Sequence, residues 1–181
     1  MQNTIIFLCL LVLLATSCHE CVEFVEIASI PLVGAYNTTA ENNTKVTLEH
    51  IKEIAVAAKR NDVSIVIFPE AILWWFFSRE EALASTLVSE FTLVSNGTTS
   101  NGEKLNPCKT QPNTILGAVS CLSSEVGITL VVNLATRTNA LLYNTAIASG
   151  PTGIVLASYR KMHVYGSSPQ FDAPSSGDLS F

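Results

Sequence analysis

The feature that most constrains the fold is a short apolar run at residues 63–68, which ends abruptly in Pro69 and Glu70. The run is rich in β-branched residues and lacks the helical period, so it predicts a strand covered on both faces, as in a sheet flanked by helices. Proline has no N–H to give to a neighbouring strand, and Pro69 therefore places Glu70 just past the strand's carboxyl end. Open α/β sheets usually have their active or binding sites at the carboxyl ends of the strands, which makes Glu70 the first candidate for a functional residue. On this stretch alone, a solvated loop glutamate is the commoner explanation.

A helical pattern precedes this run. Residues 48–60 have apolar side chains at helical spacing, an acidic first turn and a basic last turn, which complement the helix macrodipole. Thr44 or Thr47 offers a hydroxyl to cap this helix, because residues 36–44 are polar and predict a loop. Residues 24–29 predict an opening strand. The resulting β-α-β order implies a right-handed crossover between neighbouring parallel strands, and hence an α/β fold class.

The rest of the chain continues to alternate helical and extended patterns, and 181 residues have room for one domain. The predicted elements are, in order, a short helix from Arg79 capped by Ser78, a long surface loop at 95–110, a helix at 114–125 ended by Gly127, a buried strand at 128–134, and strands at 143–149 and 154–159 joined by a Gly-Pro-Thr-Gly hairpin.

An aromatic cluster at residues 74–77 follows Glu70 closely. It either lines a pocket beside the carboxylate or fills the core, and the sequence favours neither. In a pocket of low dielectric the pKa of Glu70 is expected to rise, which would make the carboxylate a better base.

The N-terminus predicts a secretory signal peptide. Residues 5–15 are continuously apolar but too short to span a bilayer, and the small residues Ala15-Thr16-Ser17 follow in the arrangement that signal peptidase reads. We expect a signal peptide at 1–17, cleavage before Cys18, and a mature chain of residues 18–181. A bacterial lipoprotein signal with Cys18 lipidated, or an uncleaved anchor, are the alternatives.

Glycosylation sequons and cysteines agree with secretion. Asn37, Asn42 and Asn96 each begin an N-x-T sequon in a polar, turn-rich stretch, so all three are predicted glycosylation sites. One of the five cysteines lies in the leader, and the even number that remains favours disulfides in an oxidising compartment. Cys18 and Cys21 form a C-x-x-C motif beside the cleavage site, for which a structural role is favoured over a redox role.

Several classes of function are excluded. The formal net charge of −5 leaves no basic stripe for nucleic acid, and no segment after the leader is long and apolar enough to cross a membrane. The three histidines are scattered, so we expect neither a metal site nor a cofactor. The oligomeric state is open.

Short motifs downstream follow a recognisable order: Phe68-Pro69-Glu70, Asn106-Pro107-Cys108, Ser120-Cys121, Val131-Val132-Asn133-Leu134, Tyr143-Asn144-Thr145, Tyr159-Arg160-Lys161 and Phe171-Asp172-Ala173-Pro174. In this order the sequence resembles the vanin and biotinidase branch of the nitrilase (carbon-nitrogen hydrolase) superfamily, over roughly residues 24–181. The resemblance implies the N-terminal part of an α-β-β-α sandwich.

The resemblance also implies an enzyme of the secreted or extracellular space that cleaves linear amides related to pantetheine or biotinyl amides. The catalytic residues of that family are a Glu, Lys, Cys triad. Glu70 matches the general base of the triad, and Lys161 matches the catalytic lysine. The base takes the proton of the thiol, and the ammonium stabilises the oxyanion of the tetrahedral intermediate. A solvated lysine at a strand end is the alternative for Lys161. Cys108 and Cys121 resemble the family's disulfide pair.

The nucleophilic cysteine of this family lies beyond the Phe-Asp-x-Pro segment, and the sequence ends at Phe181 before reaching it. The chain is therefore expected to be a fragment or an inactive copy of the enzyme, and a membrane anchor could follow in a missing C-terminal part. Two alternatives stay open: a non-catalytic secreted glycoprotein that keeps the scaffold as a binding module, and a chain that misfolds because the lost strands expose its core.

Overall fold

The computed structural model describes residues 24–26, 39–74, 78–91, 98–99, 101–164 and 170–175. Four sets of sequence predictions lie outside these residues: the signal peptide, the cysteines at positions 18 and 21, the glycosylation sites at Asn37 and Asn96, and the aromatic residues 75–77.

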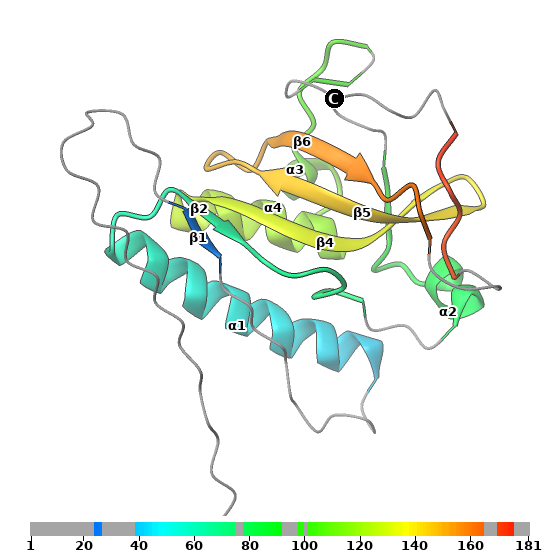
Figure 1. Cartoon of the computed structure of the whole chain (residues 1–181), viewed down its shortest axis with the longest axis horizontal. Helices are drawn as coiled ribbons and strands as arrows, with labels where there is room; N and C mark the ends of the chain where they lie inside the picture. Colours follow the sequence, from blue (N-terminus) through cyan, green and yellow to red (C-terminus); the bar gives the residue numbers. More distant parts are fainter. Residues whose placement is uncertain are drawn as a thin grey trace, which may run out of the picture.

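A mixed six-stranded sheet forms the centre of the described part (Figure 1). Its strands run in the order β1-β2-β4-β5-β6, and β3 also pairs with β4. The strands are β1 (Phe24–Glu26), β2 (Ile65–Ile67), β3 (Ser89–Glu90), β4 (Thr129–Thr138), β5 (Leu141–Ser149) and β6 (Val155–Arg160). β1 and β2 are parallel neighbours, as the β-α-β order predicts, whereas β4, β5 and β6 are antiparallel. The α/β fold class is confirmed.

The helices are α1 (Ala40–Arg60), α2 (Arg79–Ala84), α3 (Pro107–Thr110) and α4 (Ile115–Val126). The predicted start of α2 at Arg79 with Ser78 as its cap is confirmed, and so is the stop of α4 at Gly127, which lies in the left-handed region with φ of 69°. The helix predicted at 114–125 spans Ile115–Val126, and Thr114 caps its N-terminus. No helix in the described ranges is long and apolar enough to cross a membrane.

The start of α1 was predicted wrongly. The helix begins at Ala40, and its cap is the Thr39 hydroxyl, which accepts a hydrogen bond from the N–H of Asn42 at 3.3 Å. The first two turns carry polar residues that local propensity assigns to a loop, but Asn43, Thr44 and other side chains of these turns are buried. Tertiary packing therefore extends the helix beyond its periodic apolar part.

Helices α1 and α4 pack along each other, with Lys52 Nζ 2.6 Å from Glu125 Oε1. Apolar side chains of both helices share one core with the β4 side chains Leu130, Val132 and Leu134. The β4 side chains that lie between these, Val131 and Asn133, are half-buried on the other face of the sheet. The candidate site lies on this second face.

Both hairpins of the sheet turn on residues with positive φ. The predicted one between β5 and β6 is confirmed, with the N–H of Gly150 bonded to the carbonyl of Ile154 at 2.8 Å and a φ of 76° at Gly153. The hairpin between β4 and β5 was not predicted. It turns at Asn139, whose φ is 56°.

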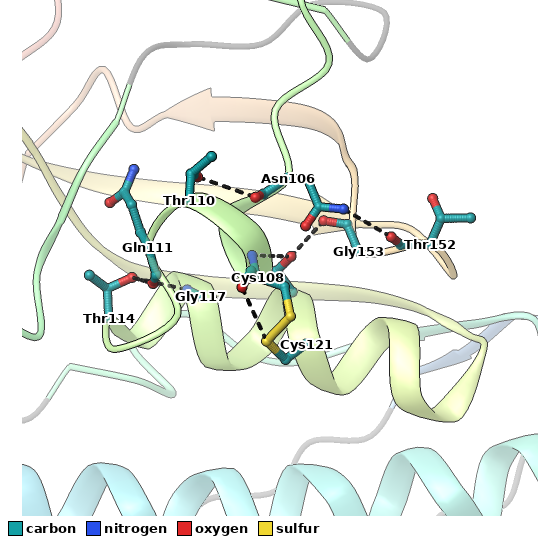
Figure 2. The surroundings of a disulfide bond; sticks show 10 residues. Asn106, Cys108, Thr110, Gln111, Thr114, Gly117, Cys121, Thr152 and Gly153 are labelled. Carbon is teal, nitrogen blue, oxygen red and sulfur yellow. Dashed lines mark hydrogen bonds between the residues drawn. A yellow bond between two sulfur atoms is a disulfide. The ribbon is translucent and has the colours of Figure 1, made fainter.

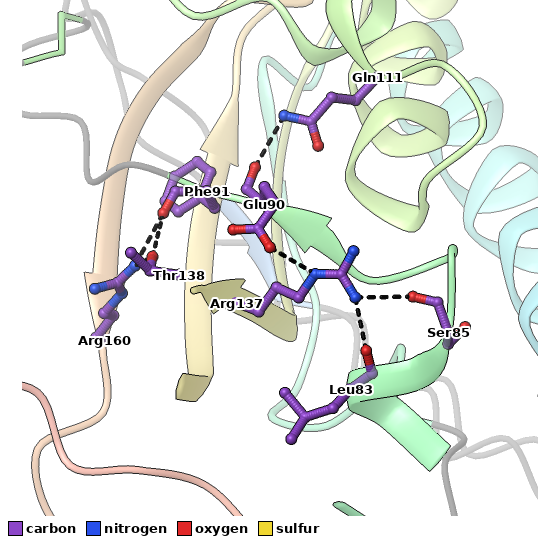
Figure 3. A network of polar contacts seen from close by, with 8 residues as sticks. All are labelled: Leu83, Ser85, Glu90, Phe91, Gln111, Arg137, Thr138 and Arg160. Atoms are coloured by element: carbon purple, nitrogen blue, oxygen red, sulfur yellow. Dashed lines mark hydrogen bonds and ion pairs between the residues drawn. The ribbon is translucent and has the colours of Figure 1, made fainter. Parts of the chain in front are cut away.

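Two arginines anchor the end of β4 and β6 (Figure 3). Arg137 pairs with Glu90 of β3 at 2.8 Å and donates to the carbonyl of Leu83 at 2.8 Å. Arg160 is buried, lies 3.8 Å from the centre of the Tyr143 ring and donates to the carbonyl of Phe91 at 3.0 Å. Because Arg160 is fixed on the helix-facing side, the next residue of the chain points to the other face.

Candidate active site

Glu70 lies where sequence analysis expects it, in the turn that follows β2. The N–H of Phe68 still pairs with the carbonyl of Val131 at 2.9 Å, and the chain turns immediately afterwards. Ala71 adopts a left-handed backbone with φ of 61°, and its N–H donates to Asn133 Oδ1 at 2.7 Å. Glu70 is thereby held over the sheet face that carries Asn133.

Lys161 reaches the same place from the end of β6. Its backbone N–H donates to the carbonyl of Asn144 at 2.8 Å, which continues the pairing of β5 with β6 by one residue. Its ammonium then donates to Glu70 Oε1 at 2.5 Å, joining residues that are 91 positions apart in the sequence. The structure therefore brings together the two candidate residues that the resemblance pairs.

Two asparagines complete the cluster, and neither has a role predicted from the sequence. Asn144 Nδ2 donates to Glu70 Oε1 at 2.9 Å, and Asn133 Nδ2 donates to Asn144 Oδ1 at 2.5 Å. Both project from central strands, β4 and β5. The available signal was an asparagine inside an apolar strand, where an unpaired amide would be costly and a polar partner is therefore expected.

The pKa of Glu70 is lowered from its ordinary value. The hydrogen bond from Lys161 is the main cause, and the amide of Asn144 and the charge of Lys161 act in the same direction. Burial acts in the opposite direction but is outweighed, because the side chain is 55% exposed. The pKa is lowered because a nearby ammonium favours the ionised carboxylate more than the surroundings disfavour it. The rise was predicted only for a pocket lined by the aromatic cluster, of which residues 75–77 lie outside the described residues.

The Phe-Asp-x-Pro segment anchors the chain beside this cluster. Asp172 exchanges two hydrogen bonds of 2.7 Å with the backbone of Leu142 in β5, and its carboxylate lies 2.5 Å from the guanidinium of Arg79. Phe171 packs against Trp74 with ring centroids 4.5 Å apart. In Figure 1 this red segment lies beside α2. Trp74 thus packs against this segment, a few residues beyond Glu70.

The two described cysteines lie away from this cluster. Cys108 and Cys121 are joined by a disulfide between α3 and α4, the pairing that the resemblance implies (Figure 2). Ser120 accepts from the N–H of Cys108 at 3.0 Å and donates to the carbonyl of Gly153 at 2.5 Å. Ser120 therefore links the disulfide-bonded Cys108 to the β5–β6 turn by hydrogen bonds. This turn lies beyond the end of β5 that is farther from Asn144.

The remaining site predictions are placed as follows. Asn42 is exposed in the first turn of α1, whereas Thr44 of the same sequon is buried. Within the residues that the structure describes, no group of three or more His, Cys, Asp or Glu side chains could hold a metal ion.

Chemically, the cluster combines a carboxylate that stays ionised with an ammonium in direct contact. An ionised carboxylate can accept a proton, and an ammonium can stabilise a developing oxyanion. Both functions depend on a reacting group that approaches the exposed side of Glu70.

The sequence matches the family described as Carbon-nitrogen hydrolase over residues 28–178. No curated protein matches it. Among solved structures, an amidase from Nesterenkonia sp. is 20% identical with a TM-score of 0.51, and the alignment covers 74% of this chain and 43% of the amidase. Another structure of that amidase shows acrylamide added at its active-site cysteine.

Nit3 of Saccharomyces cerevisiae, a member of branch 10 of the nitrilase superfamily, is 17% identical with a TM-score of 0.51. The alignment covers 77% of this chain and 45% of Nit3. The likeness to these structures shows the fold alone. The chain spans a little less than half of the length of either protein.

Proposed function

Because this chain belongs to the carbon-nitrogen hydrolase family, we propose that it serves in the hydrolysis of linear amide C–N bonds. Glu70 is the general base, and Lys161 stabilises the oxyanion. The observation that carries the proposal is the 2.5 Å contact between Lys161 Nζ and Glu70 Oε1, made across 91 residues of sequence. Neither the solvated-loop explanation of Glu70 nor the solvated-strand-end explanation of Lys161 predicts such a contact.

The nucleophile in this proposal is a cysteine of the full-length protein beyond residue 181, by analogy with the active-site cysteine of the Nesterenkonia amidase. Glu70 removes the proton of the thiol, and the thiolate attacks the amide carbonyl. Lys161 stabilises the resulting oxyanion. Collapse of the intermediate breaks the C–N bond, and the amine leaves with the proton that Glu70 returns to it.

The second half of the reaction regenerates the enzyme. A thioester remains after the amine leaves. Glu70 takes a proton from water, and the hydroxide formed attacks the thioester carbonyl. The acid product leaves, and the sulfur takes back the proton. The lowered pKa of Glu70 keeps the carboxylate ionised before each of the two attacks but also weakens it as a base, so the assigned role rests on its contact with Lys161.

We further propose that the protein belongs to the vanin and biotinidase branch and acts outside the cell on pantetheine-like or biotinyl-like amides. The predicted signal peptide, the sequons at Asn37, Asn42 and Asn96, and the Cys108–Cys121 disulfide support this assignment. Disulfides of this kind persist in oxidising compartments. A glycosidase-treated secreted sample that does not change in mass would refute the glycosylation.

The test is amine release by the full-length secreted protein from pantetheine, a biotinyl amide and acetamide. Glu70→Gln should lower kcat/KM by about 10²-fold or more, since general bases contribute about that factor. Lys161→Met should lower it by a similar factor. Lys104→Met, at an exposed lysine outside the cluster, is the matched control. Hydrolysis that survives Glu70→Gln would refute the assigned base.

The transcript decides between this function and the non-catalytic binding module. A codon for cysteine in a strand that follows residue 181 supports the hydrolase. An in-frame stop directly after residue 181 refutes it for this chain and leaves the binding module, for which we expect no turnover of any of the three amides.

A further inference from the structure

We infer that Asn133 and Asn144 form a one-way hydrogen-bond relay that positions Glu70, so that its Oε1 is always an acceptor and its Oε2 is the oxygen that takes up the proton. The inference deepens the proposed function, and it rests on that function only for the role of Glu70 as a base. The hydrogen bonds themselves do not depend on it.

The direction of the relay is set by a group that can only donate. The backbone N–H of Ala71 has no lone pair to offer, so the side-chain atom of Asn133 that lies 2.7 Å away must be its oxygen. The amide nitrogen of Asn133 must then face Asn144, whose oxygen lies 2.5 Å from it. The amide nitrogen of Asn144 is thereby turned toward Glu70 Oε1, at 2.9 Å. The hydrogen-bond network therefore determines how both amides are oriented.

The starting point of the relay is rigid. Asn133 and Asn144 project from β4 and β5, where their backbones pair with Ala146 and Ala135 respectively. The N–H of Leu73 also donates to the Asn133 carbonyl, at 3.4 Å, so the loop after Glu70 is tied to the sheet at two points. A group supported by strands keeps its orientation better than one supported by a loop.

The two carboxylate oxygens of Glu70 consequently differ. Oε1 faces two donors, the amide of Asn144 at 2.9 Å and the ammonium of Lys161 at 2.5 Å. A proton on Oε1 would point at one of these donors, which costs free energy. Oε2 has no hydrogen-bond partner among the described residues, and the side chain is half-exposed. The proton is therefore taken up at Oε2, and the reacting thiol must approach from that side.

The test is the titration of the Glu70 carboxyl carbon, followed by carbon-13 NMR in the full-length protein and assigned with Glu70→Gln. Asn144→Ala and Asn133→Ala should both raise the midpoint, because the first removes the amide that donates to Oε1 and the second removes the group that orients this amide. Asn133→Ala is the discriminating variant, since Asn133 does not touch Glu70. Asn113→Ala, at an exposed asparagine outside the cluster, should leave the midpoint unchanged.

The isosteric variant Asn133→Asp covers the case in which the alanine variants do not fold. Its carboxylate still accepts from Ala71 but cannot donate to Asn144, so the Asn144 amide turns its oxygen toward Glu70 and the midpoint rises. Because the new charge by itself also raises the midpoint, the neutral variant Asn133→Leu, which likewise cannot donate to Asn144, must raise it too. An unchanged midpoint in a folded Asn133 variant overturns the relay. Since the titration does not require turnover, a moved midpoint without amidase activity refutes only the proposed function, and activity with an unmoved midpoint refutes only the relay.

Discussion

Replacing Asp172 with alanine tests the anchor that holds the Phe-Asp-x-Pro segment beside β5. The carboxylate of Asp172 lies 2.5 Å from Arg79 Nη2 and accepts the N–H of Leu142 at 2.7 Å. The side chains of the pair are 27% and 28% exposed, so the pair is largely but not fully removed from water. Its loss should therefore cost more than that of a surface ion pair and less than that of a buried one.

The expected loss of stability in Asp172→Ala lies between the values for a surface ion pair and for a buried one. Surface ion pairs contribute about 0–1 kcal/mol, and breaking a buried pair costs about 3–5 kcal/mol. Arg79 keeps the carbonyls of Gln170 at 3.0 Å and Ala140 at 3.4 Å, so its charge is not left without partners. We therefore expect Asp172→Ala to lower the free energy of unfolding by about 2 kcal/mol, near the middle of the two ranges.

Urea unfolding of the full-length protein measures this loss, with tryptophan fluorescence as the probe because Trp74 packs against Phe171. Asp172→Asn should cost less than Asp172→Ala, since the amide oxygen can still accept from Leu142. Glu103→Ala, at an exposed glutamate, is the control and should stay within about 0.5 kcal/mol of wild type. If Asp172→Ala stays within the same limit, the anchor does not stabilise the fold.

Three further predictions concern stability. Replacing both Cys108 and Cys121 with alanine should lower the free energy of unfolding by about 3 kcal/mol, because the disulfide closes a loop with a sequence separation of 13. Gly117→Ala should lower the melting temperature, because the added Cβ would overlap the backbone carbonyl oxygen of Gln111, which costs about 1–3 kcal/mol. In a pH series, wild type should be more stable than Glu70→Gln above the ordinary pKa of glutamate, and this difference in the free energy of unfolding should shrink at lower pH. The reason is that Lys161 lowers the pKa of Glu70 in the folded state. The stabilisation by the ionised carboxylate is then lost as the pH falls through the folded pKa.

Each of these predictions has its own control. A reductant should destabilise wild type but not the cysteine double variant, and an unaffected wild type would contradict the first prediction. Ser124→Ala, on the exposed face of α4, should leave the melting temperature unchanged or slightly raised. A constant difference between wild type and Glu70→Gln from neutral to acid pH would show that Lys161 does not favour the ionised carboxylate.

The elements that could be predicted from the sequence are those whose signals are local. The helix α4 has a capping threonine and a glycine stop, and the β5–β6 hairpin has its own turn residues. The first turns of α1 and the last residues of β4 could not be predicted, because their side chains are polar and their order comes from packing and strand pairing. Tertiary contacts override weak local propensity in such segments.

The same division holds for the candidate site. The sequence by itself determined that a carboxylate follows a buried strand, since a proline ends the strand there, and the motif order indicated Lys161 as its companion. Only the tertiary structure decided that the two touch, that Asn144 and Asn133 extend the contact, and that the pKa of Glu70 falls rather than rises. The physical reason is that a strand end can be recognised from neighbouring residues, whereas the charge and hydrogen-bond donors around a carboxylate are brought there by strands distant in the sequence.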